Sequence, residues 1–267
     1  MNRTPTTFDL HPEGATRPRA RDHIDVTLPL WREWFAGGDW LALRMSPVFR
    51  GEGVPHGDGS AIVLIPGMLA SDWTMREMAR WLRRMGYRPY LSGIGRNDRC
   101  PEMSLADIVR TVDRAYDETG RKVGIVGHSL GGLLSRGAAT LRPRQISTII
   151  TLGSPVNGAR VHPFVRLAAE MMQGDCDGEC LAALQQPLPS NIREVNVYSR
   201  TDGIVSWRTC IRPEATSVEV PGTHVGMVVN PAVYAVLANA LMQGVAARTP
   251  RPFDSGRRLA VVPTLAA

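Results

Sequence analysis

The sequence lacks long apolar runs and has almost no lysine, and these absences exclude several classes of function. No stretch approaches the roughly 18 consecutive apolar residues of a transmembrane helix, so no membrane span is expected. Lys122 is the single lysine among 31 basic residues, and the arginines are scattered although the net charge is +6. Nucleic-acid binding usually needs a concentrated basic patch, so no nucleic-acid partner is expected. The basic balance leaves open acidic substrates or transient contact with a lipid interface.

The sequence also has few cysteines and no apolar core for a secretory signal. Residues 1–22 are polar and rich in arginine and proline, which predicts a cytoplasmic location and reduced thiols. Two disulfides stay open as alternatives, a local one between Cys176 and Cys180 and one between Cys100 and Cys210. The spacing of Cys176 and Cys180, with no histidine nearby, is poor for zinc, and no metal site is expected.

Short apolar runs alternate with amphipathic stretches along most of the chain. The runs predict strands at 61–65, 88–91, 122–126, 146–152, 192–198 and 217–220. The amphipathic stretches predict helices at 72–85, 104–119, 130–141 and 231–247, the first two capped by Ser71 and Ser104. This alternation is typical of an α/β protein with a mostly parallel sheet of about six strands, flanked by helices.

Three segments depart from this rhythm and suggest the organisation of the chain. Residues 1–60 read as an arm followed by short helices that break at Gly37-Gly38, residues 61–248 as the α/β core, and residues 249–267 as a tail. Residues 153–191 separate two consecutive strands by more chain than a crossover needs. We therefore expect a small helical lid at 153–191, over the carboxyl ends of the strands.

The most informative motif is Gly127-His-Ser-Leu-Gly131, which directly follows a predicted strand and opens a predicted helix. A G-x-S-x-G string in this context is typical of a nucleophile elbow, which lifts the hydroxyl of its serine, here Ser129, above the end of a strand. Gly127 and Gly131 suit the close approach of strand and helix in such a turn. The alternative is an ordinary glycine-rich turn with a solvated serine.

A serine nucleophile needs a base and a group that orients the base. His224 lies in the loop after the last predicted strand, where catalytic groups of a parallel sheet gather, and His162 in the lid is a distant second candidate. Asp202 follows the preceding strand, although an Asp-Gly pair is also a common turn. The order Ser129, Asp202, His224 predicts a catalytic triad.

An oxyanion that develops during acyl transfer needs backbone N–H donors. We expect these donors to be the N–H groups of Leu130, which follows the nucleophile, and of Met68, in the loop after the first strand. Gly67 would let that loop approach the substrate closely. Apolar residues beside the catalytic loops or in the lid are candidate substrate contacts: Leu69, Trp73, Phe164, Met171, Val205 and Val225.

Five segments together resemble a known enzyme family: Leu64-Ile-Pro-Gly-Met-Leu, Gly127-His-Ser-Leu-Gly-Gly, Leu152-Gly-Ser-Pro, Tyr198-Ser-Arg-Thr-Asp-Gly-Ile-Val and Gly222-Thr-His. They resemble a small α/β-hydrolase of the bacterial lipase and esterase type. The resemblance implies the α/β-hydrolase fold and hydrolysis of a small or lipid-like carboxylic ester, through an acyl-enzyme on Ser129 and without a cofactor. Acyl transfer and cleavage of thioesters, amides or lactones stay open, as does a non-catalytic ligand-binding homologue.

Overall fold

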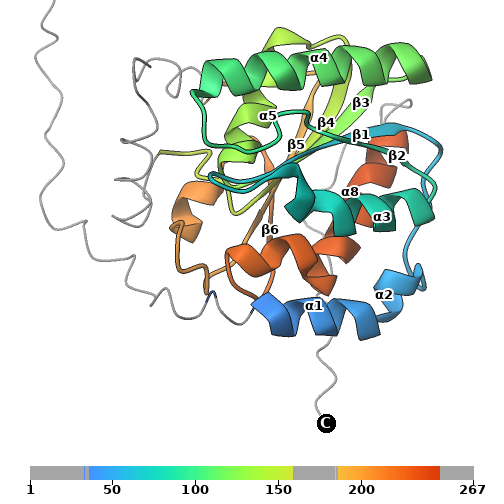
Figure 1. Ribbon diagram of the computed structural model, residues 1–267, viewed down its shortest axis with the longest axis vertical. Coiled ribbons are helices and arrows are strands. Elements are labelled where there is room, and N and C mark those ends of the chain that lie inside the picture. Colours follow the sequence, from blue (N-terminus) through green and yellow to red (C-terminus); the bar gives the residue numbers. More distant parts are fainter. Residues whose placement is uncertain (1–32, 34–35, 159–183, 185, 247–267) are drawn as a thin grey trace, which may run out of the picture.

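The protein folds around one parallel sheet. The computed structural model describes residue 33, residues 36–158, residue 184 and residues 186–246. Within these ranges the strands run in the order β2-β1-β3-β4-β5-β6, and every neighbouring pair is parallel (Figure 1). The strands are β1 (Ala61–Ile65), β2 (Arg88–Leu91), β3 (Val123–His128), β4 (Ile146–Leu152), β5 (Arg193–Tyr198) and β6 (Thr216–Glu219). The predicted parallel sheet of six strands is confirmed.

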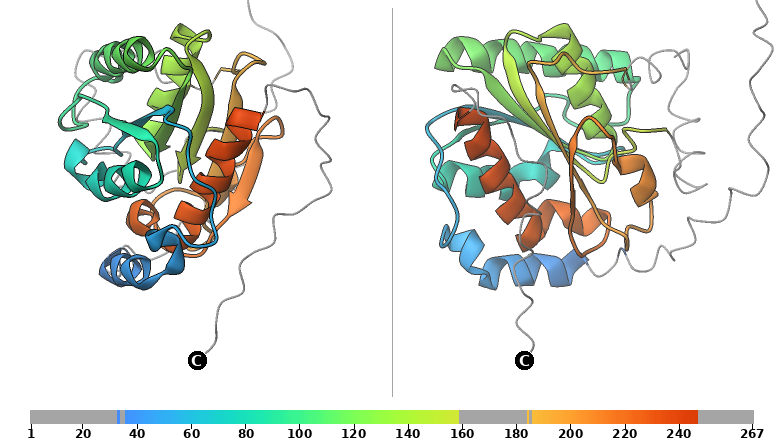
Figure 2. Two further views of the ribbon diagram at one scale, coloured as in Figure 1. Left: turned by 90° about the vertical axis from the view of Figure 1, so that its right-hand side faces the viewer. Right: turned by 180° about the vertical axis from the view of Figure 1, so that it is seen from behind.

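Helices cover both faces of this sheet (Figure 2). Helices α4 (Pro101–Thr119) and α5 (Leu130–Leu141) pack on one face. The other face carries α1 (Ala36–Met45), α2 (Pro47–Arg50), α3 (Arg76–Arg84) and α8 (Pro231–Ala246). Short 3-10 helices complete the loops: η2 (Asp72–Met75), η3 (Trp207–Cys210) and η4 (Val225–Val229).

The burial of the strands follows from this three-layer arrangement. Every residue of β1 is buried, with Ile62 and Leu64 in the core beneath α3 and α8, and Val63 and Ile65 in the core beneath α4 and α5. A strand covered on both faces is apolar throughout, which is why β1 reads as a continuous apolar run. Strand β2 lies at the edge of the sheet, where Pro89 costs no ladder hydrogen bond.

Three helix boundaries differ from the sequence prediction. The helix predicted at 72–85 begins as η2, its α-helical part α3 starts at Arg76, and Ser71 makes no capping hydrogen bond with its side chain. Helix α1 runs through Gly37-Gly38, and the break falls at Ser46, whose hydroxyl accepts a hydrogen bond from the Phe49 N–H. Both glycines are exposed and allow a Cβ, so they cost the helix only about 1 kcal/mol each. Helix α4 begins at Pro101 rather than at Ser104, because proline suits the first helical position.

The lid predicted at 153–191 falls mostly on residues 159–183, which lie outside the described ranges together with the candidate contacts Phe164 and Met171. Both ends of this stretch are held by the core. At the entry, Asn157 donates from its backbone N–H to Thr209 O and from its side chain to Ile211 O. At the exit, the buried guanidinium of Arg136 on α5 donates to the carbonyl oxygens of Leu184 and Gln186 and pairs with Glu194.

The cysteines correct two sequence expectations. Cys100, at the start of α4, is disulfide-bonded, whereas Cys210 is a buried free thiol. The proposed Cys100–Cys210 pair is therefore wrong, as is the expectation that all four thiols are reduced. Cys176 and Cys180 lie outside the described residues. No helix that the structure describes is long and apolar enough to cross a membrane.

Candidate active site

The predicted catalytic loops meet at the carboxyl edge of the sheet. Strands β1 and β3 are neighbours there, with Ile65 paired to Gly127, although β2 lies between them in sequence. The chain leaves β1 toward one face and leaves β3 toward the other, through α3 and α5. Such a switch point opens a crevice at the strand ends, which is where parallel sheets bind ligands.

Ser129 occupies a strained turn at the end of β3. Its φ of 52° and ψ of −121° lie in a region that L-residues rarely adopt. The turn is held by the Ser129 N–H, which donates to Leu152 O at 2.8 Å. A Cβ on Gly131 would stand 2.5 Å from Ile65 O and 2.6 Å from Pro66 O, so only glycine fits. This geometry is that of a nucleophile elbow.

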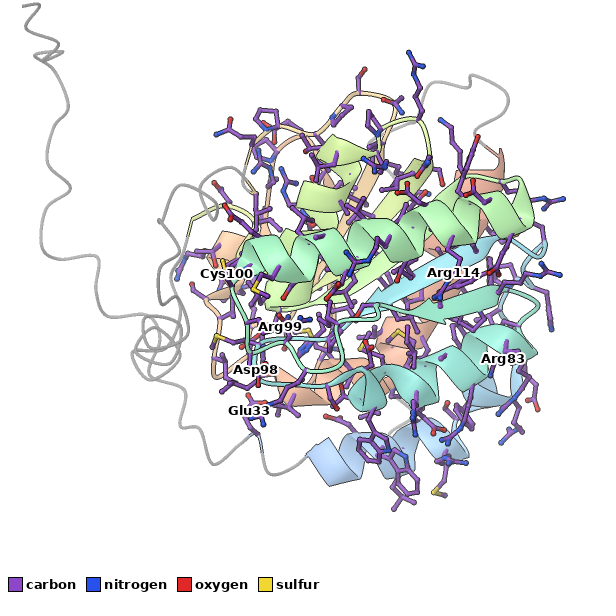
Figure 3. All side chains as sticks on the ribbon, turned by 45° about the horizontal axis from the view of Figure 1, so that its top comes forward. Glu33, Arg83, Asp98, Arg99, Cys100 and Arg114 are labelled. Carbon is purple, nitrogen blue, oxygen red and sulfur yellow. The ribbon has the colours of Figure 1, made fainter. Side chains whose placement is uncertain are left out.

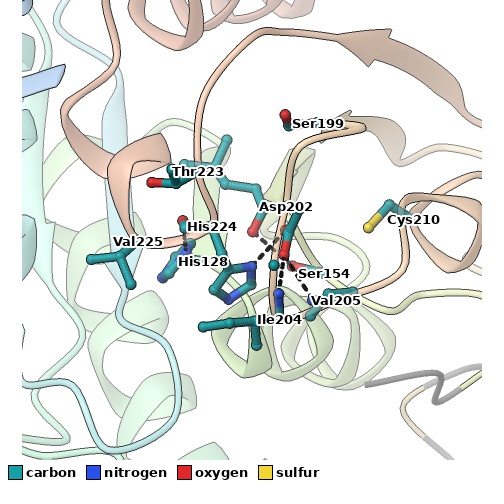
Figure 4. Close-up of polar contacts among 12 residues, drawn as sticks. His128, Ser154, Ser199, Asp202, Ile204, Val205, Cys210, Thr223, His224 and Val225 are labelled. Atoms are coloured by element: carbon teal, nitrogen blue, oxygen red, sulfur yellow. Dashed lines mark hydrogen bonds and ion pairs between the residues drawn. The ribbon is translucent and has the colours of Figure 1, made fainter. Parts of the chain in front are cut away.

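Asp202 and His224 form a buried pair (Figure 4). The His224 Nδ1–H donates to Asp202 Oδ2 at 2.7 Å, and both side chains are at least 95% buried. The other carboxylate oxygen accepts from the N–H groups of Ile204 and Val205. Burial lowers the pKa of His224, but the charge and hydrogen bond of Asp202 and the charge of Glu33 outweigh it, so the pKa is raised.

This pair lies beside the serine turn. Gly153, the residue after the carbonyl that holds Ser129, approaches both members of the pair. A Cβ on Gly153 would stand 3.0 Å from His224 Nδ1 and 3.1 Å from Asp202 Oδ2. Among the described residues no hydrogen bond joins the Ser129 hydroxyl to His224.

His128, which precedes Ser129, contacts the backbone of His224. Its Nε2 lies 3.0 Å from His224 O, and because a carbonyl only accepts, this nitrogen carries the proton. The two rings are 4.7 Å apart. Burial, together with the nearby His224, lowers the pKa of His128 to about 3, against the hydrogen bond that raises it. His128 is therefore neutral at physiological pH. The sequence did not predict its contact with the His224 backbone.

Asn97, which sequence reasoning did not single out, holds the predicted oxyanion loop. Its backbone accepts from the Leu69 N–H at 2.7 Å and donates to Ala70 O at 2.8 Å. Its buried side chain donates to Pro66 O at 2.9 Å. These bonds flank Met68, whose N–H has no partner among the residues that the structure describes, and the same is true of the Leu130 N–H. Within the described ranges, the two expected oxyanion donors are thus unpaired.

The remaining candidate contacts divide by exposure. Leu69 lies in the predicted oxyanion loop and is 45% exposed, and Trp73 lies on η2 directly after it and is 69% exposed. Val225, next to His224, is 43% exposed. Val205 is only 1% exposed and supports Asp202 through its N–H, so its side chain is not open to a substrate. In the described parts of the chain, no three histidine, cysteine or acidic side chains gather as metal ligands.

Solved structures share this fold. The mature lipase BlEst2 of Bacillus licheniformis superposes with a TM-score of 0.56 at 18% identity, over 72% of this chain and 96% of that one. A structure of the metagenome-derived lipolytic enzymes LipS and LipT gives a TM-score of 0.55, also at 18% identity, over the same shares of the two chains. The protein has the α/β-hydrolase fold, as the resemblance implied.

Sequence comparison adds relatives and a family. A triacylglycerol lipase of Burkholderia plantarii is 25% identical over 140 residues, and one of Pseudarthrobacter phenanthrenivorans is 26% identical over 114 residues. These matches cover 49% and 39% of this chain, and only 39% and 36% of the lengths of the two lipases. The profile of the PGAP1-like alpha/beta domain family matches residues 102–236, just over half of the sequence. The chain therefore belongs to the PGAP1-like alpha/beta domain family.

Proposed function

We propose that this protein hydrolyses carboxylic esters through an acyl-enzyme on Ser129, with His224 as the base and Asp202 as the group that orients it. The observation that carries the proposal is the buried Asp202–His224 pair beside the strained serine turn. The likeness to lipases in sequence and the shared fold support the same reaction.

The geometry suits each step of this reaction. Because the Nδ1–H of His224 donates a hydrogen bond to Asp202, the Nε2 atom is left to accept the proton of Ser129. The serine oxygen then attacks the acyl carbon, and the N–H groups of Met68 and Leu130 stabilise the oxyanion. Protonated His224 returns its proton to the leaving alcohol. Water, deprotonated by the same imidazole, attacks the acyl-enzyme and releases the acid, which restores Ser129.

The surroundings of the site favour an ester with an apolar acyl or alcohol part. The exposed side chains of Leu69, Trp73 and Val225 line the loops that carry the oxyanion donor and the base. Each would bury apolar surface against such a substrate, a gain of about 25 cal/mol per Å². No acidic side chain is among the three.

Two measurements on the wild-type protein test the proposal. We expect turnover of p-nitrophenyl esters in a series from acetate to palmitate, with faster turnover of medium acyl chains than of acetate because the rim is apolar. We expect a fluorophosphonate probe to label Ser129, as identified by peptide mass spectrometry. A folded protein that hydrolyses no ester and stays unlabelled would favour a binding role. Labelling without ester turnover would favour the acyltransferase, amidase or lactonase alternatives.

Asn97 offers a test of the oxyanion assignment. Asn97→Ala removes the bond to Pro66 O, on the N-terminal side of Met68, while the backbone bonds of Asn97 to Leu69 and Ala70, on its C-terminal side, remain. We expect kcat to fall by roughly 10-fold with KM nearly unchanged, less than the 100-fold loss typical of removing a donor outright. Steady-state kinetics on a p-nitrophenyl ester measures both constants.

A matched control exists for this substitution. The exposed Asn191 donates its side-chain amide to Pro143 O at 2.7 Å, the same kind of bond away from the site. Asn191→Ala should leave kcat unchanged. Equal losses in both variants, or a loss confined to KM, would contradict the role of Asn97.

A further inference from the structure

Glu33 joins the two loops that carry the acid and the base. Its Oε1 accepts from the N–H of Gly203, next to Asp202, and from the N–H of His224, both at 3.2 Å. Its Oε2 accepts from the Val225 N–H at 2.8 Å. The two loops are 170 and 191 residues away in sequence, so these contacts exist only in the folded protein. Figure 3 shows Glu33 at the same end of the molecule as Asp98 and Cys100.

The three donors have no alternative partner in the part of the chain that the structure describes. In the acid loop, the N–H groups of Ile204 and Val205 are taken by Asp202, which leaves the Gly203 N–H to Glu33. Without Glu33, two partly buried N–H groups, of Gly203 and His224, and the exposed N–H of Val225 would lose their acceptor. The two partly buried groups would be left without a protein acceptor, which weakens the hold on both loops.

The neighbourhood of Glu33 shows that the contact is part of a packed interface. Helix α1 packs against η4, which begins directly after His224. The Asp39 carboxylate of α1 fills the space where a side chain at Gly226 would stand. Burial, and then the charge of Glu33, raises the pKa of Asp39. Glu33 and Asp39, which both precede the first strand in sequence, therefore face the loop that carries His224.

We propose that Glu33 is a positioning residue of the ester hydrolysis inferred above, whose carboxylate holds the acid loop and the base loop together so that His224 stays against Asp202. The proposal rests on the proposed function. Glu33 acts through the backbone of both partners and does not touch the substrate. A 1 Å displacement of a catalytic group can cost about 100-fold in rate, so such a clamp has a large effect on kcat.

The decisive variant is Glu33→Gln, which keeps the shape of the side chain. Its carbonyl oxygen can accept from Gly203 and His224, but its NH2 group would then face the Val225 N–H, and two donors oppose each other. We expect kcat to fall by roughly 10- to 100-fold with KM changed less than about 2-fold. Glu33→Asp keeps the charge but is too short to reach both loops, and should recover only part of the rate. Glu52→Gln, which removes an exposed carboxylate paired with Arg50, is the control.

The pH profile separates positioning from a merely structural role. The groups that face His224 are Asp202, Glu33 and the neutral His128, with Asp39 close to Gly226. Glu33 contributes to the raised pKa of His224, and the unprotonated imidazole is the active form, so activity disappears as the pH falls through that pKa. Removing the charge lowers the pKa, so the acidic limb of kcat/KM should move to lower pH in Glu33→Gln and stay in place in Glu33→Asp and Glu52→Gln.

A measurement that needs no substrate turnover tests the role of Glu33 independently of the proposed ester hydrolysis. NMR of the protein labelled with 15N-histidine reports the His224 pKa and its Nδ1 proton directly. A lower pKa and a weakened Nδ1–H signal in Glu33→Gln would support the clamp even if the wild-type protein hydrolysed no ester. An unchanged His224 titration with wild-type kcat would overturn it. A Glu33→Gln protein that fails to fold would assign Glu33 to stability and overturn it equally.

Discussion

Replacing Ser129 with alanine is expected to lower kcat for any ester substrate by roughly four to six orders of magnitude, because no other group can form the acyl-enzyme. The fold should be unaffected, since alanine keeps the Cβ that already stands in the strained turn at a φ of 52°. Steady-state hydrolysis of the best p-nitrophenyl ester, together with thermal unfolding, measures both expectations.

Ser129→Gly is the matched comparison for this variant. Glycine adopts a positive φ without strain, a relief of about 1–3 kcal/mol that its larger unfolded-state entropy partly offsets. Ser129→Gly should therefore be as inactive as Ser129→Ala but no less stable. Wild-type turnover in either variant would remove Ser129 from the chemistry, while loss of folding in both would show that the hydroxyl serves the turn itself.

Replacing Asp202 with asparagine is expected to lower kcat by about 10⁴-fold. Asp202 uses one oxygen for Ile204 and Val205 and the other for His224. An asparagine that keeps its carbonyl oxygen toward the backbone N–H groups presents its NH2 group to His224 Nδ1. This nitrogen must then accept, so the proton moves to Nε2, and the imidazole can no longer take a proton from Ser129.

The tautomer of His224 distinguishes Asp202→Asn from other inactive variants. NMR of 15N-labelled histidine should show the proton of His224 on Nδ1 in the wild-type protein and on Nε2 in Asp202→Asn. Asp98→Asn, which removes a carboxylate paired with Arg96, is the control and should change neither the tautomer nor kcat. Retention of the Nδ1 tautomer together with normal turnover in Asp202→Asn would contradict the assigned role.

The sheet was predictable because each strand has a local signal. Strand β1 is an uninterrupted apolar run, and β3 leads into a glycine-flanked serine, so both strands and their type follow from nearby residues. The order of the strands in the sheet was not predicted, because it depends on which face each helix covers. Helix α1 passed through Gly37-Gly38 since packing and exposure outweigh a small propensity cost. The boundaries at 60 and 248 and the cytoplasmic location stay predictions.

The site was predictable where its residues follow strands and unpredictable where they reach across the fold. Ser129, Asp202 and His224 each lie just after a strand, and the structure brings their loops to one edge of the sheet. Asn97 and Glu33 lie in segments with no motif of their own, and their contacts are with backbone atoms, which carry no sequence signature. The predicted Cys100–Cys210 pair was wrong because two loops at one edge of the sheet do not fix which cysteines meet: Cys100 is disulfide-bonded, whereas Cys210 is a buried free thiol.

The two anchors around residues 159–183 make this stretch separable from the architecture that carries it. Asn157 fixes its entry against η3, and Arg136 fixes its exit against α5 and β5. The entropy of closing a loop grows only slowly with its length, so a shorter or longer stretch between fixed ends costs little folding energy. Evolution or an engineer can therefore change the length of the chain between these two anchors without rebuilding the sheet.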